Sequence, residues 1–419
     1  MRGSICFPLE RTTGQQKKLA VITISFKLFN MGIKQLESSL KEFYGKLKAN
    51  KSSFHPIDVL IPISVANILL PNNPIPSNTL AVSWAIWQLI FSPKKLRWAL
   101  WPVATVLLVS VRTWWLNEQP DLVSGADGLM IVASMLAAVN INQKRWYFIL
   151  ISCLAALPLA ALQLSPKPWT PNPFVGVNPG GYLLGLLLVI AIAWYSKPGK
   201  SLISVIISSM SSALAILLVW QTGSRAALVS SFLALAIVFL RERAQEKSVW
   251  REISLLTIFT ALCLGLKQLI SPSSSGVPGL NISSDLGRIL IGKCYLNLPL
   301  TGNNRLLYGV GFERPKEFCQ ELINGGIADH SHNLYLQIWA NSGILGLLGV
   351  ALLAVLLIQA WLKVGSDLDV FTRRAGKVAL LYLIFQGFFD LSLLHLPIIQ
   401  VLTGITLSAP IRKMSLNSA

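Results

Sequence analysis

The sequence predicts an all-α protein that crosses a membrane many times, and three observations indicate this class. Hydrophobic residues make up 53% of the 419 residues, whereas only 13% are charged, too few to cover a soluble protein of this length. The apolar residues occur in runs long enough to cross the hydrocarbon core. The 36 Lys and Arg residues lie in short clusters between these runs. The composition therefore excludes a soluble or disordered chain, and the scattered clusters argue against a nucleic-acid binder.

Residues 1–55 precede the first apolar run and are predicted to form a basic cytoplasmic segment. They lack the long apolar core and the small-residue cleavage site of a secretory signal peptide. Within them, Ile33–Leu47 carries apolar residues at helical spacing, with lysines on the other faces. Such a helix would lie on the inner membrane surface with its lysines toward anionic headgroups. A solvated cytosolic tail is the alternative that the sequence leaves open.

Apolar runs of about 20 residues, or somewhat fewer where the ends snorkel, predict about twelve transmembrane helices in the rest of the chain. Nine of them fall in residues 56–270 and three in residues 334–409. The predicted spans are Asp58–Leu70, Leu80–Ser92, Trp98–Val111, Leu129–Ile141, Trp146–Leu164, Tyr182–Tyr195, Leu202–Trp220, Ala226–Leu240, Ile253–Ile270, Leu334–Leu362, Val378–Phe389 and Leu393–Ala409. The first two are short and are separated only by the uncharged turn Pro71–Asn78.

Clusters of Lys and Arg fall at every second connection, which the positive-inside bias assigns to the cytoplasm. This topology places 27 of the 36 basic residues but only 9 of the 18 acidic residues on the cytoplasmic side, so the other side has no net charge. The net charge of +18 therefore reflects the orientation of the chain in the membrane. Both termini, including residues 410–419, are predicted to be cytoplasmic. The alternate connections, among them Gln221–Arg225 and residues 271–333, would face the periplasm of a bacterial inner membrane.

The turn Gln221–Arg225 places an arginine at the mouth of two apolar helices, with no acidic residue near it in the sequence. An ionisable residue at membrane depth is costly and indicates a functional site. Arg225 also begins a helix that Ser224 or Thr222 would cap, where backbone N–H groups favour an anion. Its guanidinium suits a phosphate ligand. The alternative is an interfacial arginine that snorkels.

Residues 271–333 form one large outer loop that is predicted to be partly helical. Ser284–Lys293 has the pattern of a capped amphipathic helix with Arg288 in its first turns, and Pro315–Ile323 predicts a second short helix. Gly309-Val310-Gly311 breaks the chain between them. A loop of this length is functional or disordered, and its helix signals favour function.

Cys294 and Cys319 both fall in this outer loop. An oxidising compartment would permit a disulfide between them. Two unpaired buried thiols are the alternative, because spacing alone does not decide between the two states. The five cysteines of the chain show no metal-ligand spacing.

The loop ends in the sequence Asp329-His330-Ser331-His332-Asn333, directly before a long apolar run. Two imidazoles beside a carboxylate have the ligand types of a metal site. They equally suit a general base, because imidazole titrates near neutral pH. A helix cap that anchors the chain at the interface is the third interpretation. His395, with Asp390 nearby, lies near the same outer face and is interpreted as supporting or merely interfacial.

The segment His332-Asn333, nine residues and then Gly343-Ile344-Leu345-Gly346 resembles a signature of the O-antigen ligase and polymerase superfamily of bacterial envelope glycan enzymes. Other features agree in their order along the chain: Gly223-Ser224-Arg225, Arg288 in an early loop helix, Gly309-Val310-Gly311 and Phe388-Phe389-Asp390. The resemblance covers residues 180 to 409 and is closest to the ligases. It implies an architecture similar to that of GT-C-like glycosyltransferases.

The resemblance implies a metal-independent glycosyltransferase of lipopolysaccharide synthesis that uses no cofactor. Its donor would be a glycan on polyprenyl pyrophosphate, such as undecaprenyl pyrophosphate, and its acceptor a sugar hydroxyl of a lipid-linked molecule, lipid A-core. By resemblance His332 is the base, and Arg225 and Arg288 bind the pyrophosphate. The resemblance also leads us to expect substrate-binding or supporting roles for Arg305, Arg314, His330 and Asn333. Gly343, Gly346 and Gly349 are predicted to leave one helix face bare for close packing.

Two other functions remain open at this point. A polymerase would use the same donor chemistry with a growing lipid-linked chain as acceptor. A transporter, as proposed for bicarbonate-carrying relatives, would be expected to show internal repeats and discontinuous helices, and the sequence has no persuasive repeat. Membrane lipids are expected partners, nucleic acid is not, and the sequence identifies no protein partner.

Overall fold

The computed structural model describes residues 55–70, 74–91, 122–139, 141–163, 177–243, 282–302, 305–311, 315–322, 330–364, 367–390, 393, 396–411 and 413. Every regular element within these residues is helical. The predicted surface helix Ile33–Leu47 and the predicted spans Trp98–Val111 and Ile253–Ile270 lie outside the described residues.

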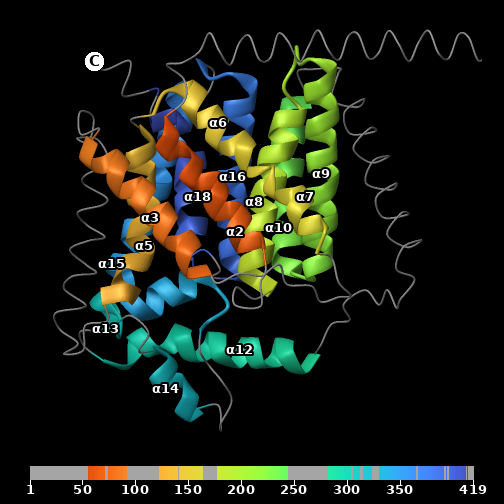
Figure 1. The fold of residues 1–419 in the computed structure, drawn as a ribbon. Helices are drawn as coiled ribbons and strands as arrows, with labels where there is room; N and C mark the ends of the chain where they lie inside the picture. Colours follow the sequence, from red (N-terminus) through yellow and green to blue (C-terminus); the bar gives the residue numbers. More distant parts are fainter. Residues whose placement is uncertain are drawn as a thin grey trace, which may run out of the picture.

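The long helices pack side by side as a bundle, and α12 lies across one end of it (Figure 1). In chain order the elements are η2 (Pro56–Val59), α2 (Leu60–Leu69), α3 (Pro74–Phe91), α5 (Leu122–Val139), α6 (Gln143–Cys153), α7 (Ala156–Ala161), α8 (Val177–Tyr195), α9 (Leu202–Thr222), α10 (Arg225–Arg243), α12 (Ile282–Asn297), η4 (Leu298–Thr301), α13 (Arg305–Tyr308), α14 (Pro315–Leu322), α15 (Leu334–Val364), α16 (Val370–Phe389) and α18 (Pro397–Leu407).

The apolar surface of the bundle is that of an integral membrane protein. Four stretches among the described residues are long and apolar enough to cross a membrane: Gln143–Ala161, Val177–Tyr195, Leu202–Thr222 and Leu334–Lys363. Large apolar side chains also remain exposed at helical spacing. On α15 these are Leu348, Leu352, Val355 and Ile358, each 44% to 51% exposed. Exposure of such an apolar stripe to water is unfavourable, whereas its contact with lipid is favourable.

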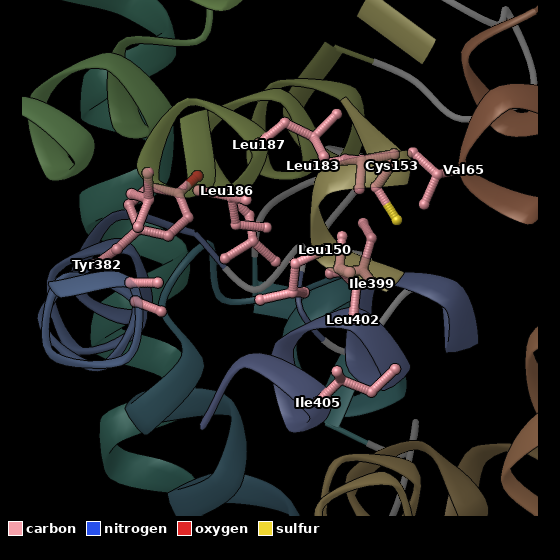
Figure 2. Packing of buried hydrophobic residues seen from close by; sticks show 14 of the residues in the cluster. Val65, Leu150, Cys153, Leu183, Leu186, Leu187, Tyr382, Ile399, Leu402 and Ile405 are labelled. Atoms are coloured by element: carbon pink, nitrogen blue, oxygen red, sulfur yellow. The ribbon is translucent and has the colours of Figure 1, made fainter. Parts of the chain in front are cut away.

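Helix α8 forms the centre of the bundle, and its side chains from Gly180 to Ala193 are all buried. A helix that is apolar all round requires neighbours on every side, and α8 packs against α9, α10 and α16. Figure 2 shows leucines of α8 meeting α6 and α18 in this core. Gly185 allows α16 to approach closely, because a Cβ there would lie 2.3 Å from the Tyr382 hydroxyl oxygen.

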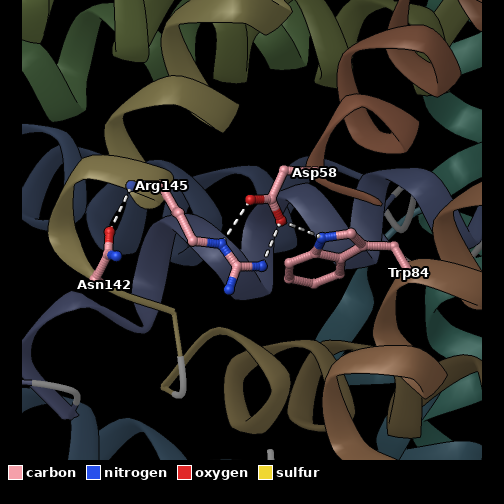
Figure 3. A network of polar contacts seen from close by, with 4 residues as sticks. All are labelled: Asp58, Trp84, Asn142 and Arg145. Atoms are coloured by element: carbon pink, nitrogen blue, oxygen red, sulfur yellow. Dashed lines mark hydrogen bonds and ion pairs between the residues drawn. The ribbon is translucent and has the colours of Figure 1, made fainter. Parts of the chain in front are cut away.

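A buried ion pair joins the first helices to α6 (Figure 3). Arg145 donates from Nε to Asp58 Oδ2 at 2.6 Å and from Nη2 to Oδ1 at 2.8 Å, and Trp84 Nε1 donates to Oδ1 at 3.1 Å. Asp58 is fully buried, so its charge depends on these donors. The pair fixes η2, α3 and α6 relative to one another.

Prolines cause two differences between the predicted and observed helix bounds. The predicted span Trp146–Leu164 is divided into α6 and α7, because Pro158 has no N–H to donate to the carbonyl of Leu154. That carbonyl accepts from Leu157 N instead, at 3.1 Å. The predicted turn Pro71–Asn78 is too long, since α3 already begins at Pro74, where the first helical turn accommodates proline.

Helix α15 is broken at Gly343, so the prediction of one continuous helix is wrong there. Gly343 has φ 61° and ψ −153°, which no α-helix contains. Residues 334–342 form a first segment and residues 344–364 a second. The second segment is about 30 Å long, the thickness of the hydrocarbon core. Gly343 therefore provides a bend rather than part of a bare helix face.

The break in α15 holds the outer loop through direct contact between two stretches of backbone. Val310 N donates to Ala340 O at 2.8 Å, and Gly311 N donates to Asn341 O at 3.0 Å. A Cβ on Gly309 would lie 2.3 Å from the Asn341 carbonyl carbon, and one on Gly343 would lie 2.6 Å from Leu306 O. Both glycines also have positive φ, 71° and 61°. We call residues 309–311 with residues 340–343 the loop clamp.

A disulfide and a small core complete the attachment of the loop. Cys294 of α12 and Cys319 of α14 are disulfide-bonded, with their Cα atoms 5.9 Å apart, which resolves the two alternatives left by the sequence. Around them lies a second apolar cluster that includes Tyr295, Val310 and Ala340. Because Ala340 belongs to α15, the loop core is continuous with the start of that helix.

The loop clamp predicts that Gly343→Ala destabilises the protein more than an ordinary glycine replacement. Gly199 is a matched control, since it has φ 68° but nothing within 4 Å of the position that a Cβ would occupy. Gly199→Ala should cost about 1 to 2 kcal/mol for the left-handed backbone. Gly343→Ala adds a clash with the α13 backbone and a φ/ψ combination that essentially only glycine adopts. The Tm of this variant in detergent should therefore fall further, and trypsin should cleave its loop sooner. Equal losses in the two variants would contradict the clamp.

Candidate active site

His330, His332 and Asp390 come together at the end of the bundle that the loop covers. Their ligand atoms all lie within 4.8 Å of one another. The two imidazole rings are 4.3 Å apart between centroids and inclined at 60°. Asp390 is only 3% exposed, whereas both histidines are partly accessible. The group thus combines a buried carboxylate with two half-buried imidazoles.

Asn333 and Tyr335 fasten the start of α15 to the end of α16. Asn333 Oδ1 caps α15 by accepting from the backbone N–H groups of residues 335 and 336 at 2.9 and 3.0 Å. Its Nδ2 donates to Phe388 O at 3.0 Å. The Tyr335 hydroxyl donates to Ile384 O at 3.0 Å. Since Asp390 is the C-cap residue of α16, these bonds fix the histidines beside it.

His332 has φ 53°, a left-handed backbone that is unusual for a residue other than glycine. The neighbouring residues hold this conformation. Ser331 N donates to Gln337 Oε1 at 3.1 Å, and Ser331 Oγ accepts from Asn333 N at 3.2 Å. Gln337 Nε2 in turn donates to Asn341 Oδ1 at 3.1 Å, and Asn341 belongs to the loop clamp. Strained residues that persist in this way concentrate at functional sites.

Arg225 begins α10 directly after a tight turn. Gly223 ends α9 in the left-handed conformation, Ser224 N donates to Thr222 Oγ1 at 3.2 Å, and Ser224 Oγ accepts from Ala227 N at 3.4 Å. A Cβ on Gly181 would lie 2.6 Å from Ser224 Cβ, so the turn rests on the start of α8. The predicted cap by Ser224 is confirmed, and Arg225 itself is partly exposed.

The packing of α10 on α16 places Arg225 at the same end as Asp390. At the other end, the Arg374 guanidinium lies 5.3 Å above the Phe239 ring. Arg225 precedes Phe239 by 14 residues, about 21 Å, and Asp390 follows Arg374 by 16 residues, about 24 Å. The two helices therefore run antiparallel, and Arg225 and Asp390 lie at nearly the same level.

The packing of α12 beside the first segment of α15 positions the helix that carries Arg288. A Cβ on Gly292 would lie 3.7 Å from Leu336 Cδ1, and Trp339 Nε1 donates to Leu296 O at 2.9 Å. The two segments therefore run parallel. Arg288 lies one helical turn before Gly292, on the same face of α12. The Arg288 side chain is exposed.

Arg305 contacts the loop itself in this structure. Its guanidinium lies 4.9 Å above the Phe318 ring, and Nη1 donates to Thr301 Oγ1 at 3.2 Å. Asn333 makes the contacts of a positioning residue. The substrate-binding roles expected for both stay predictions, as do the roles of His330, His332, Arg225 and Arg288. Arg314, Asp329 and His395 lie outside the described residues.

Asp390 is the acidic residue that the structure brings to the two histidines. We expected Asp329 beside them, because it is adjacent in sequence. Asp390 lies 58 residues after His332 and reaches it through the contact between α15 and α16. The sequence placed Asp390 near the same outer face, beside His395 and in Phe388-Phe389-Asp390 at the end of a predicted span, but did not pair it with His330 and His332.

Comparison with known protein families identifies the family of the segment that contains Arg225, Arg288 and His332. A family model described as O-antigen ligase matches residues 210–351. Residues 210–351 belong to the O-antigen ligase family. This confirms the resemblance seen in the sequence. No curated protein matches the chain. The O-antigen ligase domain includes Arg225, Arg288, His332 and both halves of the loop clamp, whereas Asp390 lies beyond it.

The family and the apolar helices together define the protein in general terms. It is an integral membrane protein with an O-antigen ligase domain. Such a domain indicates an enzyme of the glycosyltransferase kind that acts on lipid-linked glycans by ligase-type or polymerase-type transfer.

The two functions of Asn333 can be separated by substitution. Asn333→Ala removes the cap of α15 and the bond to Phe388, so the free energy of unfolding should fall by about 2 kcal/mol. Asn333→Asp keeps a capping oxygen and loses only the amide donor, so it should lose about half as much. Both should reduce glycan transfer, because His332 is released from Asp390. Full transfer by Asn333→Asp, measured beside thermal unfolding, would contradict the positioning role.

Proposed function

We propose that this protein is an O-antigen ligase-like enzyme. It would transfer a glycan from a polyprenyl-pyrophosphate donor to a sugar hydroxyl of a lipid-linked acceptor, lipid A-core. One observation carries the proposal: His330, His332 and Asp390 come together at the end of the bundle where Arg225 begins α10 and across which α12, with Arg288, lies (Figure 1). We infer that a base for the acceptor and cationic groups for the leaving pyrophosphate act together at this end.

The proposed reaction uses each group once. The acceptor hydroxyl oxygen attacks the anomeric carbon of the donor sugar while its proton passes to the His332 imidazole. The bond between the anomeric carbon and the pyrophosphate oxygen breaks, and its electron pair leaves with the pyrophosphate. Arg225 and Arg288 stabilise the negative charge that develops there. Asp390, beside the imidazoles, orients His332 and stabilises the imidazolium.

In our proposal the enzyme does not depend on a metal ion, although His330, His332 and Asp390 are residue types that can bind one. Two imidazoles and a carboxylate are suitable zinc ligands. In the proposed reaction, however, both tasks that a metal would perform are assigned to side chains: His332 takes the proton and the arginines stabilise the leaving group. Transfer by the purified enzyme should therefore persist in excess chelator.

We place the site on the periplasmic side of a bacterial inner membrane. Two observations support this orientation. The loop at this end contains the disulfide Cys294–Cys319, and disulfides form in oxidising compartments. The opposite end carries Arg145, Lys197 and Arg374, as the positive-inside bias requires of a cytoplasmic face. With residues 98–111 and 253–270, the chain would complete twelve spans and resemble the GT-C-like enzymes.

The proposal predicts that His332→Ala, Arg225→Ala and Arg288→Ala each reduce transfer at least about 100-fold. Lys293→Ala is the matched control, because Lys293 is an exposed cation on the same helix as Arg288. The measurement is the electrophoretic pattern of surface glycan in a deletion strain that carries each variant. Loss of all capped lipid indicates a ligase, and retention of single repeat units indicates a polymerase. Intact glycan with both His332→Ala and Arg225→Ala would contradict glycan transfer by this site.

A further inference from the structure

A cavity lies at the end of the bundle opposite the histidines, where α6, the turn between α8 and α9, and the start of α16 meet. Its volume is about 580 Å³, and its lining residues are Asn142, Gln143, Lys144, Tyr147, Lys197 and Asp369. All six side chains are polar or carry a polar group. The proposed transfer reaction uses none of them, so their arrangement needs another explanation.

The carboxylate in this cavity is fully occupied by the protein. Asp369 Oδ1 accepts from the Tyr147 hydroxyl and from the backbone N–H groups of Phe371 and Thr372, and Oδ2 accepts from Gln143 Nε2 and Thr372 Oγ1. A carboxylate offers about four acceptor sites, so five donors exhaust it. Partial burial acts to raise the pKa of Asp369, but the hydrogen bonds from Thr372 and Tyr147 and the nearby Lys197 hold it below its ordinary value. Asp369 therefore stays ionised next to Lys197 and holds the walls of the cavity together, and its acceptor sites are filled by the protein.

Lys197 retains capacity for a ligand. Its Nζ lies 4.7 Å above the Tyr147 ring and donates to the Tyr147 hydroxyl at 3.4 Å. This commits one of its three N–H donors. Lys144 lies in the first turn of α6, and its side chain is exposed beside the cavity. Two ammonium groups against one carboxylate give the cavity a net positive charge beside the amides of Asn142 and Gln143, a combination that suits a phosphate.

The surface next to the cavity indicates that this phosphate belongs to a lipid. Five residues after Lys197, α9 begins with an apolar outer face: Leu202 is 68% exposed, Ile206 47% and Met210 52%. A headgroup bound near Lys197 would have its acyl chains along this face. The basic side chains that gather at this end also favour the membrane leaflet that is rich in anionic lipid.

We propose that this cavity is a binding site for the phosphate headgroup of an anionic phospholipid, held by Lys144 and Lys197. Tyr147 and Asp369 set the walls, and α9 receives the acyl chains. Basic pockets between membrane helices on the cytoplasmic side bind anionic headgroups in this way. The site is separate from the glycan-transfer site, and its occupation does not depend on the proposed function.

The test is binding of phosphatidylglycerol to the purified full-length protein, followed by native mass spectrometry and by the Tm in detergent. Phosphatidylcholine and inorganic phosphate are the comparison ligands. The wild-type protein should bind phosphatidylglycerol in preference to both. The double variant Lys144→Gln/Lys197→Gln should bind it about 30-fold more weakly, since each lysine near a lipid phosphate contributes about fivefold.

Two further variants exclude indirect effects. Lys144→Arg/Lys197→Arg keeps both charges and should retain binding, which a variant that failed to fold would not. Lys363→Gln removes an exposed cation from the last turn of α15 and should leave the affinity unchanged. Equal losses in Lys363→Gln and the double variant would overturn the proposal. So would stabilisation by inorganic phosphate equal to that by phosphatidylglycerol, because the site would then not recognise a lipid.

Discussion

The backbone contact at the loop clamp is the constraint on which the rest of the candidate site depends. Peptide groups of residues 309–311 bond to carbonyls that the break at Gly343 leaves without helical partners, so each segment satisfies the other. This contact is possible only without side chains at Gly309 and Gly343. It fixes the direction of the first segment of α15. The histidines directly precede that segment, and α12 rests on it.

The two ends of the bundle are built for different tasks. At one end lie the strained His332, the buried Asp390, the partly exposed Arg225 and the exposed Arg288, groups that would suit the proposed reaction, in which a proton and a charged leaving group separate. The other end combines a carboxylate neutralised within the protein, in the Asp58–Arg145 pair, with the lysines of the proposed lipid site. The apolar core around α8 lies between the two ends, so the proposed lipid site and the proposed transfer site are separate.

The sequence predicted those parts of the fold that depend on local pattern. Apolar runs, the existence of the helix that carries Arg288 and the turn at Gly223 follow from composition and capping preferences. The cap predicted at Ser284 is wrong, because α12 begins at Ile282 and Ser284 lies inside it. The break at Gly343 could not be predicted, because the apolar pattern continues on both sides of it and the cause lies in α13. The disulfide stayed open because spacing does not give the 5.9 Å between Cα atoms. Asp390 was placed at the outer face but not paired with His330 and His332, because it is distant from them in sequence.

The most direct test of the docked loop is a cross-link between α12 and the first segment of α15. Gly292→Cys and Leu336→Cys would be combined in membranes, in a chain whose Cys6, Cys153 and Cys263 are replaced by serine, and treated with a short bifunctional thiol reagent. Because these positions are in contact, the pair should cross-link rapidly, and mass spectrometry should find the joined peptides. Gly292→Cys with Leu348→Cys, beyond the break, should not. Equal cross-linking of both pairs, or none in the first, would contradict the docking of α12, which carries Arg288, on the first segment of α15.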